Sequence, residues 1–121
     1  MTVLLVEDDP VVKLAIRRTL DCLGSRVLDA PDGERALAVA ASCQEPIDVL
    51  LTDMMMPGMS GRLLAERLTA QRPQTRVIYM SGYTEESIDR RGLGKGPCAF
   101  LAKPFSKEEL SHVMTEVLLA S

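Results

Sequence analysis

The stretch Leu50–Gly61, LLTDMMMPGMSG, places one acid between an apolar run and a turn. Asp53 follows residues typical of a buried strand, and Pro57 and Gly58 turn the chain soon afterwards. Aspartate is disfavoured in strands and is costly to bury without a partner. Asp53 taken alone is a turn or cap residue, so a chemical role depends on what the rest of the chain brings to it.

Strand-like and helical patterns alternate along the whole chain of 121 residues. Short apolar runs predict strands at Thr2–Val6, Arg26–Ala30, Ile47–Thr52, Arg76–Met80 and Cys98–Ala102. A helical pattern follows each strand, with a short one over residues 85–91, and Ser60 and Ser106 are expected helix caps. Five βα repeats predict an α/β domain whose parallel sheet is covered by helices on both faces.

Composition and charge exclude several classes of protein. The net charge of −3 and the lack of a basic stripe argue against nucleic-acid binding. The apolar runs are too short to span a membrane, and the N-terminus does not resemble a signal peptide. Cys22, Cys43 and Cys98 have no metal-site spacing and are expected to be reduced thiols. We therefore expect a single cytoplasmic domain spanning residues 1–121.

Unusual polar residues follow four of the five predicted strands. They are Glu7 and Asp8 after the first strand, Asp53 after the third, Ser81 after the fourth and Lys103 after the fifth. In open α/β sheets, ligands bind beyond the carboxyl ends of the strands. The predicted topology therefore gathers these five residues into one candidate site.

The chemistry of this set favours phosphoryl transfer. Clustered carboxylates repel one another, and a divalent cation such as Mg²⁺ relieves that repulsion. Lys103 adds a positive charge, and Ser81 adds a hydroxyl group. Gly82 has no side chain and so leaves room for a ligand to approach the backbone. No glycine-rich phosphate loop or kinase motif is present, so the phosphoryl group is expected to arrive on another molecule. Asp53 would accept it as a carboxylate nucleophile.

Four segments in order resemble the motifs of response-regulator receiver domains of two-component signalling. They are LLVEDD, LLTDMMMPGMSG, YMSGYT and FLAKPF, and the resemblance covers nearly the full chain. Each motif is weak alone, but the ordered set is specific. The flanking sequence is most similar to receivers fused to hybrid sensor histidine kinases. The resemblance implies a flavodoxin-like (βα)5 three-layer sandwich with strand order 2-1-3-4-5.

The resemblance also implies the chemical roles at the site. Asp53 matches the phosphoacceptor, and Lys103 matches the lysine that binds the phosphoryl group. Asp8 matches a direct ligand of Mg²⁺ or Mn²⁺, and Glu7 one that acts through water. Met55 matches the position that lends its backbone carbonyl to the metal, so its side chain is free to vary.

A second group of residues is implied in switching and in flanking the site. Ser81 matches the hydroxyl residue that senses the phosphoryl group, and Phe100 the aromatic residue that moves with it. Gly82, Tyr83 and Pro104 flank the site, and the peptide bond before Pro104 is expected to be cis. Met55 and Tyr83 offer no amide or carboxylate to orient water, which predicts a persistent phosphorylated state.

The implied partner is a histidine kinase or a histidine phosphotransfer protein. A downstream protein target or a kinase core on the same chain could read the switch, without nucleic acid or membrane contact by this domain. The isolated domain is expected to assist its own phosphorylation and dephosphorylation without being a turnover enzyme. Two alternatives stay open: an interaction module that is never phosphorylated, and a phosphohydrolase, which Met55 disfavours because it replaces the second acid of such enzymes.

Overall fold

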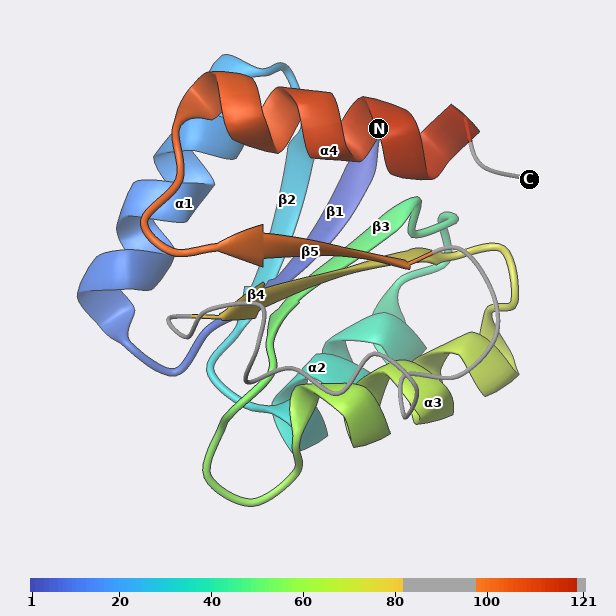
Figure 1. The fold of residues 1–121 in the computed structure, drawn as a ribbon. Helices are drawn as coiled ribbons and strands as arrows, with labels where there is room; N and C mark the ends of the chain where they lie inside the picture. The colour runs from blue at the N-terminus through green and yellow to red at the C-terminus, as the bar shows by residue number, and fades with distance from the viewer. Residues whose placement is uncertain (82–97, 120–121) are drawn as a thin grey trace.

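The computed structural model describes residues 1–81 and 98–119, and its strands form one parallel sheet (Figure 1). The strands are β1 (Thr2–Val6), β2 (Arg26–Ala30), β3 (Val49–Asp53), β4 (Arg76–Ser81) and β5 (Cys98–Ala102). The helices are α1 (Pro10–Cys22), α2 (Gly33–Ser42), α3 (Gly61–Gln71) and α4 (Lys107–Leu119). The sheet order is β2-β1-β3-β4-β5, which confirms the predicted flavodoxin-like fold. The helix predicted at 85–91, with Gly82 and Tyr83, lies outside the described residues.

Both faces of the sheet are buried under helices. Figure 1 shows α1 and α4 on one face and α2 and α3 on the other. Val3 and Leu5 pack in one core with residues of α1 and α4, whereas Leu4 and Val6 pack in the second core with residues of α2 and α3. Successive side chains of a strand point to opposite faces, so an uninterrupted apolar strand serves both cores.

The boundaries of β3 and β4 differ from those that the apolar pattern predicts. β3 begins at Val49 rather than Ile47, because its register with β1 would place Ile47 beyond the start of that strand. β3 includes Asp53, which pairs with Met80, and β4 includes Ser81. Backbone hydrogen bonds continue regardless of the side chain, so the sheet extends into the candidate site.

Helix ends follow local signals in the sequence. Ser60 Oγ accepts a hydrogen bond from the Leu63 N–H at 3.1 Å and so caps α3. Ser106 and Glu109 form the predicted capping box at the start of α4. Asp9 caps α1, because its side chain accepts hydrogen bonds from the Val11 and Val12 N–H groups. These caps fix the starts of helices that lie directly after the carboxyl ends of strands.

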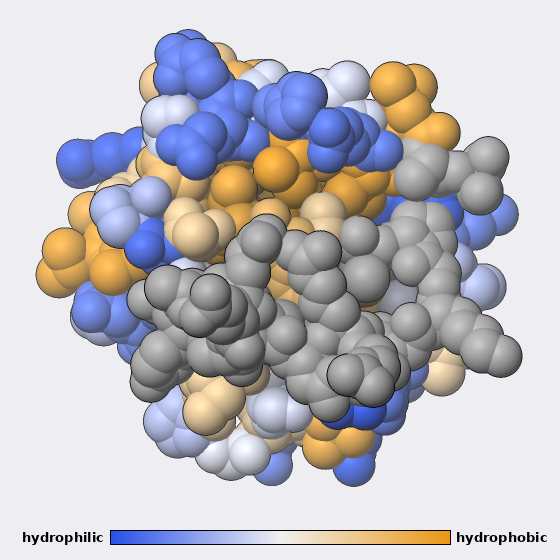
Figure 2. Space-filling view, viewed as in Figure 1, coloured by the Kyte–Doolittle hydropathy of each residue, from blue (hydrophilic) through white to orange (hydrophobic). Residues whose placement is uncertain are grey.

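The surface is polar over one helix and apolar near the start of another. Figure 2 shows hydrophilic side chains along the outer side of α4 and apolar surface at the left edge, where α1 begins. Val11 and Leu14 of α1 are 77% and 49% exposed. Leu118 of α4 is 37% exposed, whereas Leu110, Met114 and Val117 of the same helix are buried. Cys22 and Cys43 are free thiols.

Across residues 1–81 and 98–119, the helices are too short or too polar for any of them to cross a membrane.

Candidate functional site

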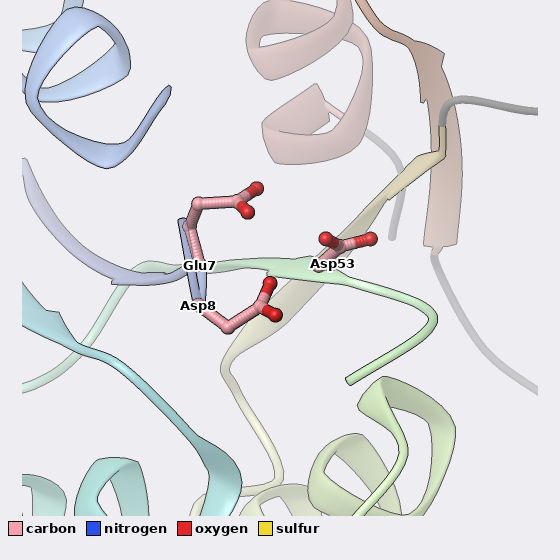
Figure 3. Close-up of side chains that lie close together, drawn as sticks. All are labelled: Glu7, Asp8 and Asp53. Atoms are coloured by element: carbon pink, nitrogen blue, oxygen red, sulfur yellow. The ribbon is translucent and has the colours of Figure 1, made fainter. Parts of the chain in front are cut away.

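Three carboxylates gather where β1 and β3 end, as Figure 3 shows. Glu7 and Asp8 follow β1, Asp53 is the last residue of β3, and one carboxylate oxygen of each lies within 4.8 Å of the others. The parallel register pairs Val6 with Thr52, so the next residues of both strands are neighbours. Glu7 and Asp53 are buried, whereas Asp8 is exposed. The cluster thus has two buried carboxylates on its inner side and one solvent-exposed carboxylate on its outer side.

Lys103 reaches this cluster from the end of β5. Its Nζ donates hydrogen bonds to Glu7 Oε2 at 3.0 Å and to Asp53 Oδ2 at 3.1 Å. The Lys103 N–H donates to the carbonyl of Ser81 at 2.7 Å, which ties the ends of β4 and β5 together. The Lys103–Pro104 peptide bond is cis, as expected. One ammonium group therefore bridges the two buried acids.

Burial and pairing set the charge state of these groups. Burial raises the pKa of Glu7, and hydrogen bonds from Lys103 and the Asp9 N–H offset this only in part. Burial alone would lower the pKa of the Lys103 ammonium, but its hydrogen bonds to Glu7 and Asp53 raise that pKa above its ordinary value. Lys103 therefore stays charged at neutral pH, and its charge only partly offsets the cost of burying the Glu7 carboxylate.

The donor set suits a hard divalent cation. The described cluster consists of carboxylates, the ligands that Mg²⁺ and Mn²⁺ favour, whereas zinc sites draw on histidine and cysteine. Asp8 is exposed and open to a hydrated ion, while Glu7 is turned to Lys103 and Asp9. The residues at the ends of β1 and β3 thus fit the predicted metal site.

The loop after β3 separates its methionines by environment. Met55 is 68% exposed, whereas Met54 and Met56 are half-buried and pack against the α2–α3 core. Met54 and Met56 therefore contribute to packing. The Met55 side chain stands in solvent, so any part of Met55 in metal binding falls to its backbone carbonyl.

Ser81 and Phe100 lie on neighbouring strands next to Lys103. Ser81 ends β4 and is 4% exposed, and its register partner is Ala102. Phe100 is half-buried, and its ring stacks on Tyr79 with centroids 5.7 Å apart. Ser81 and Phe100 therefore lie on adjacent strands, β4 and β5, and β5 leads directly to Lys103.

Gly61 reaches the site but is not assigned a role by the sequence motifs. Its N–H donates to the Met54 carbonyl at 3.1 Å, and a Cβ placed on it would lie 2.1 Å from the Asp53 carbonyl oxygen. The sequence does carry a signal, since glycine is unfavourable in a helix and yet begins this one.

Comparison with known proteins gives consistent matches. The family model described as "Response regulator receiver domain" matches residues 3–115 of this chain. Sensor kinase CckA of Brucella abortus is 34% identical over 97% of this chain, and transcriptional regulatory protein CpxR of Klebsiella pneumoniae is 38% identical over 98%. The chain spans 12% and 50% of those two proteins. The crystal structure of the receiver domain of hybrid histidine kinase CckA has 30% identity and a TM-score of 0.83, covering 98% of this chain and 99% of that one.

Proposed function

Because this chain belongs to the response regulator receiver domain family, we propose that Asp53 accepts a phosphoryl group from a phosphohistidine of a partner protein. One observation carries the proposal: the Asp53 carboxylate lies among Glu7 and Asp8, with Lys103 Nζ at 3.1 Å. A carboxylate held beside a fixed cation can act as a nucleophile toward phosphorus.

The proposed reaction forms an acyl phosphate. A carboxylate oxygen of Asp53 bonds to phosphorus as the P–N bond of the phosphohistidine breaks, and the imidazole nitrogen keeps the electron pair. Lys103 then turns from the carboxylates to an oxygen of the phosphoryl group, which needs little movement because its Nζ already bridges Glu7 and Asp53. Lys103 thereby exchanges a carboxylate partner for a phosphoryl oxygen.

We assign Mg²⁺ or Mn²⁺ as the cofactor. Asp8, Asp53 and the Met55 carbonyl would hold it directly, and Glu7 through water. When bound, it neutralises charge on the carboxylates and on the phosphoryl oxygens. The support is the donor set itself, three carboxylates with oxygens within 4.8 Å.

We propose Ser81 and Phe100 as the pair that transmits the phosphorylated state. The Ser81 hydroxyl would donate to a phosphoryl oxygen, and the Phe100 ring would follow into the space that this movement opens. The burial of Ser81 and its backbone link to Lys103 support the pairing. Gly82, Tyr83 and Pro104 are proposed to flank this edge of the site.

We propose that the phosphohistidine protein, a histidine kinase or a histidine phosphotransfer protein, docks on α1. A groove of about 460 Å³ lies between α1 and the connection from β5 to α4. It is lined by Val11, Val12 and Ala15 of α1 and by Lys103, Pro104 and Phe105. A partner seated there would hold its phosphoryl group beside Asp53, because Lys103 lines the groove and contacts the acid.

The setting of the domain is also proposed. We treat residues 1–121 as one receiver domain that works in the cytoplasm, where free thiols such as Cys22 and Cys43 stay reduced. It would pass its signal to a downstream protein or to a kinase core on its own chain. Met55 brings no acid to the site, so the domain is proposed to assist its own phosphorylation and dephosphorylation without multiple turnover.

Intact-mass spectrometry after incubation with acetyl phosphate tests the function. The wild-type domain should gain one phosphoryl group with Mg²⁺ and none without it, and Asp53→Asn should gain none. Asp9→Asn is the matched control, because asparagine also caps a helix and Asp9 lies outside the acid cluster. Phosphorylation of the peptide around position 53 in Asp53→Asn would contradict the assignment, and an unmodified wild type would favour the unphosphorylated interaction module.

A further inference from the structure

Gly61 lies against the backbone of Asp53 more closely than a side chain would permit. A Cβ on Gly61 would lie 2.1 Å from the Asp53 carbonyl oxygen, 3.0 Å from its carbonyl carbon and 3.1 Å from Met54 Cα. Real Cβ atoms essentially never come closer than 3.0 Å to another heavy atom. Because all three neighbours are backbone atoms, no side-chain rotation relieves the clash, and α3 or the end of β3 would have to shift by about 1 Å.

Backbone conformation does not explain why position 61 is a glycine. Among the described residues, the glycines with positive φ are Gly24 and Gly58, so Gly61 has a backbone that other residues also adopt. A helix favours alanine over glycine by about 1 kcal/mol. The space next to Asp53 is therefore the physical reason for a glycine at this position.

Several hydrogen bonds hold the start of α3 and the end of β3 in place around this contact. The Gly61 N–H donates to the Met54 carbonyl at 3.1 Å, and the Met54 N–H donates to the Met80 carbonyl at 3.0 Å. The Thr52 hydroxyl donates to the Asp53 carbonyl at 3.0 Å. The backbone of Asp53 is thus fixed between a hydroxyl on one side and the start of a helix on the other.

We propose that Gly61 is a positioning residue for phosphoryl acceptance: its missing side chain lets α3 seat against the Asp53 carbonyl and so sets where the carboxylate points. The inference rests on the proposed function of Asp53. The loop that Gly61 closes also contains Met55, whose carbonyl is a proposed metal ligand. A shift of about 1 Å here would misalign both the nucleophile and the metal ligands.

Gly33 is a matched control for Gly61. Each is the first residue of its helix, and each follows a residue whose side chain caps that helix. A Cβ on Gly33 would meet the Met59 side chain, with Sδ at 2.8 Å, instead of backbone. Methionine side chains are flexible, so Gly33→Ala requires a rotamer change of Met59 and a shift of its Cβ, at 3.0 Å, by a few tenths of an ångström, whereas Gly61→Ala requires movement of the strand end.

The experiment measures phosphorylation by acetyl phosphate at saturating Mg²⁺, below the unfolding midpoint of every variant. Gly61→Ala should slow the rate constant roughly 10- to 100-fold and weaken Mg²⁺ binding. Gly33→Ala should stay close to the wild-type rate. Leu68→Ala, which removes core packing from the same helix, should lower the unfolding midpoint and leave the rate unchanged.

The outcomes separate this inference from the proposed function. A folded Gly61→Ala that is phosphorylated as fast as Gly33→Ala would overturn the inference and leave the role of Asp53 intact, whereas an unmodified wild type would overturn both. If Gly61→Ala does not fold, Ser60→Ala tests the inference instead. It removes the cap and so loosens the start of α3, while position 61 stays a glycine. Its rate should fall roughly two- to fivefold, the scale of one lost cap, and an unchanged rate would overturn the inference.

Discussion

Lys103 Nζ lies 3.0 Å from Glu7 Oε2 and 3.1 Å from Asp53 Oδ2, so one ammonium group serves two buried carboxylates. Glu7 is 1% exposed, and besides Lys103 its carboxylate accepts a hydrogen bond from the Asp9 N–H, on the other oxygen, at 3.2 Å. A buried carboxylate that loses its partner is left without compensation. At the scale of single residues, the charge balance of the site therefore depends on Lys103.

Replacing Lys103 with methionine should separate its structural and chemical roles. Without metal, Lys103→Met should lower the free energy of unfolding by about 1–3 kcal/mol, because two carboxylates lose a charged donor. Mg²⁺ should then raise the unfolding midpoint more than in the wild type, since the carboxylates bind it without a competing ammonium. Phosphorylation by acetyl phosphate should slow at least about tenfold.

Thermal unfolding with and without Mg²⁺ checks the first two effects. Lys13→Met is the control, because Lys13 of α1 pairs with Asp29 of β2, at 3.6 Å, which is not one of the clustered acids. An equal Mg²⁺ response in Lys103→Met and the wild type would show that Lys103 does not compete with the cation.

We expect a second single residue, Met55, to influence the lifetime of the phosphorylated state. Its side chain is 68% exposed, so Met55→Asn should change the free energy of unfolding by less than about 0.5 kcal/mol. An asparagine amide can hold water beside the phosphoryl group, and loss of the phosphoryl group should therefore be faster. Decay of the phosphorylated mass measures it, with Leu118→Asn on α4 as the control. Equal decay rates in Met55→Asn and wild type would refute the idea.

At the scale of elements, α2 and α3 are joined at the ends that point away from the site. Arg72 follows α3, and its guanidinium donates to the carbonyls of Ala40, Cys43 and Glu45 at 2.8, 2.5 and 2.9 Å. The last carbonyls of a helix lack partners within the helix. Arg72 donates to one such carbonyl, Ala40 of α2, and to the Cys43 and Glu45 carbonyls that follow the helix, so it holds the end of α3 to the end of α2.

Arg72→Ala should therefore destabilise the fold without changing the chemistry. The loss of hydrogen bonds to three carbonyls should lower the free energy of unfolding by about 1–3 kcal/mol. Phosphorylation by acetyl phosphate should keep its wild-type rate, because the acids and Lys103 are untouched. Urea denaturation measures the stability, and Arg67→Ala, an exposed residue of the same helix, should have little effect. A slower phosphorylation rate in folded Arg72→Ala would count against this separation.

At the scale of the whole molecule, the parallel sheet places every strand's carboxyl end on one side. Figure 1 shows α1 and the connection from β5 to α4 meeting on that side, although they are far apart in the sequence. The groove between them shares Lys103 with the acid cluster. The proposed docking face and the candidate site are thus adjacent but consist mostly of different residues.

This adjacency predicts that docking can be damaged without damaging the chemistry. Val11 is 77% exposed at the groove, and Val11→Asn adds no charge near the acids. Transfer from a phosphorylated histidine phosphotransfer protein should slow severalfold, while phosphorylation by acetyl phosphate should be unchanged. Leu118→Asn on α4 is the matched surface control. If both donors slowed equally, or if neither did, the proposed docking face would be wrong.

Much of the candidate site could be predicted because the relevant signals are local. Alternating strand and helix patterns identify the βα order, and parallel strands then place Glu7, Asp8 and Asp53 together without further information. The caps at Ser60 and Ser106 are likewise short-range signals. Strand ends were less predictable, because backbone pairing carries β3 and β4 on into polar residues that an apolar pattern excludes.

The sequence by itself determined the order of the elements and the residue types that follow the strands, since periodicity and motif order depend on neighbours along the chain, and its family resemblance implied the strand order. Only the tertiary structure decided that Lys103 bridges Glu7 as well as Asp53, that Arg72 joins α2 to α3, and that Gly61 has no room for a side chain. These last features are distances of a few ångströms between segments far apart in the chain. They follow from how close-packed helices and strands meet, which no local pattern records.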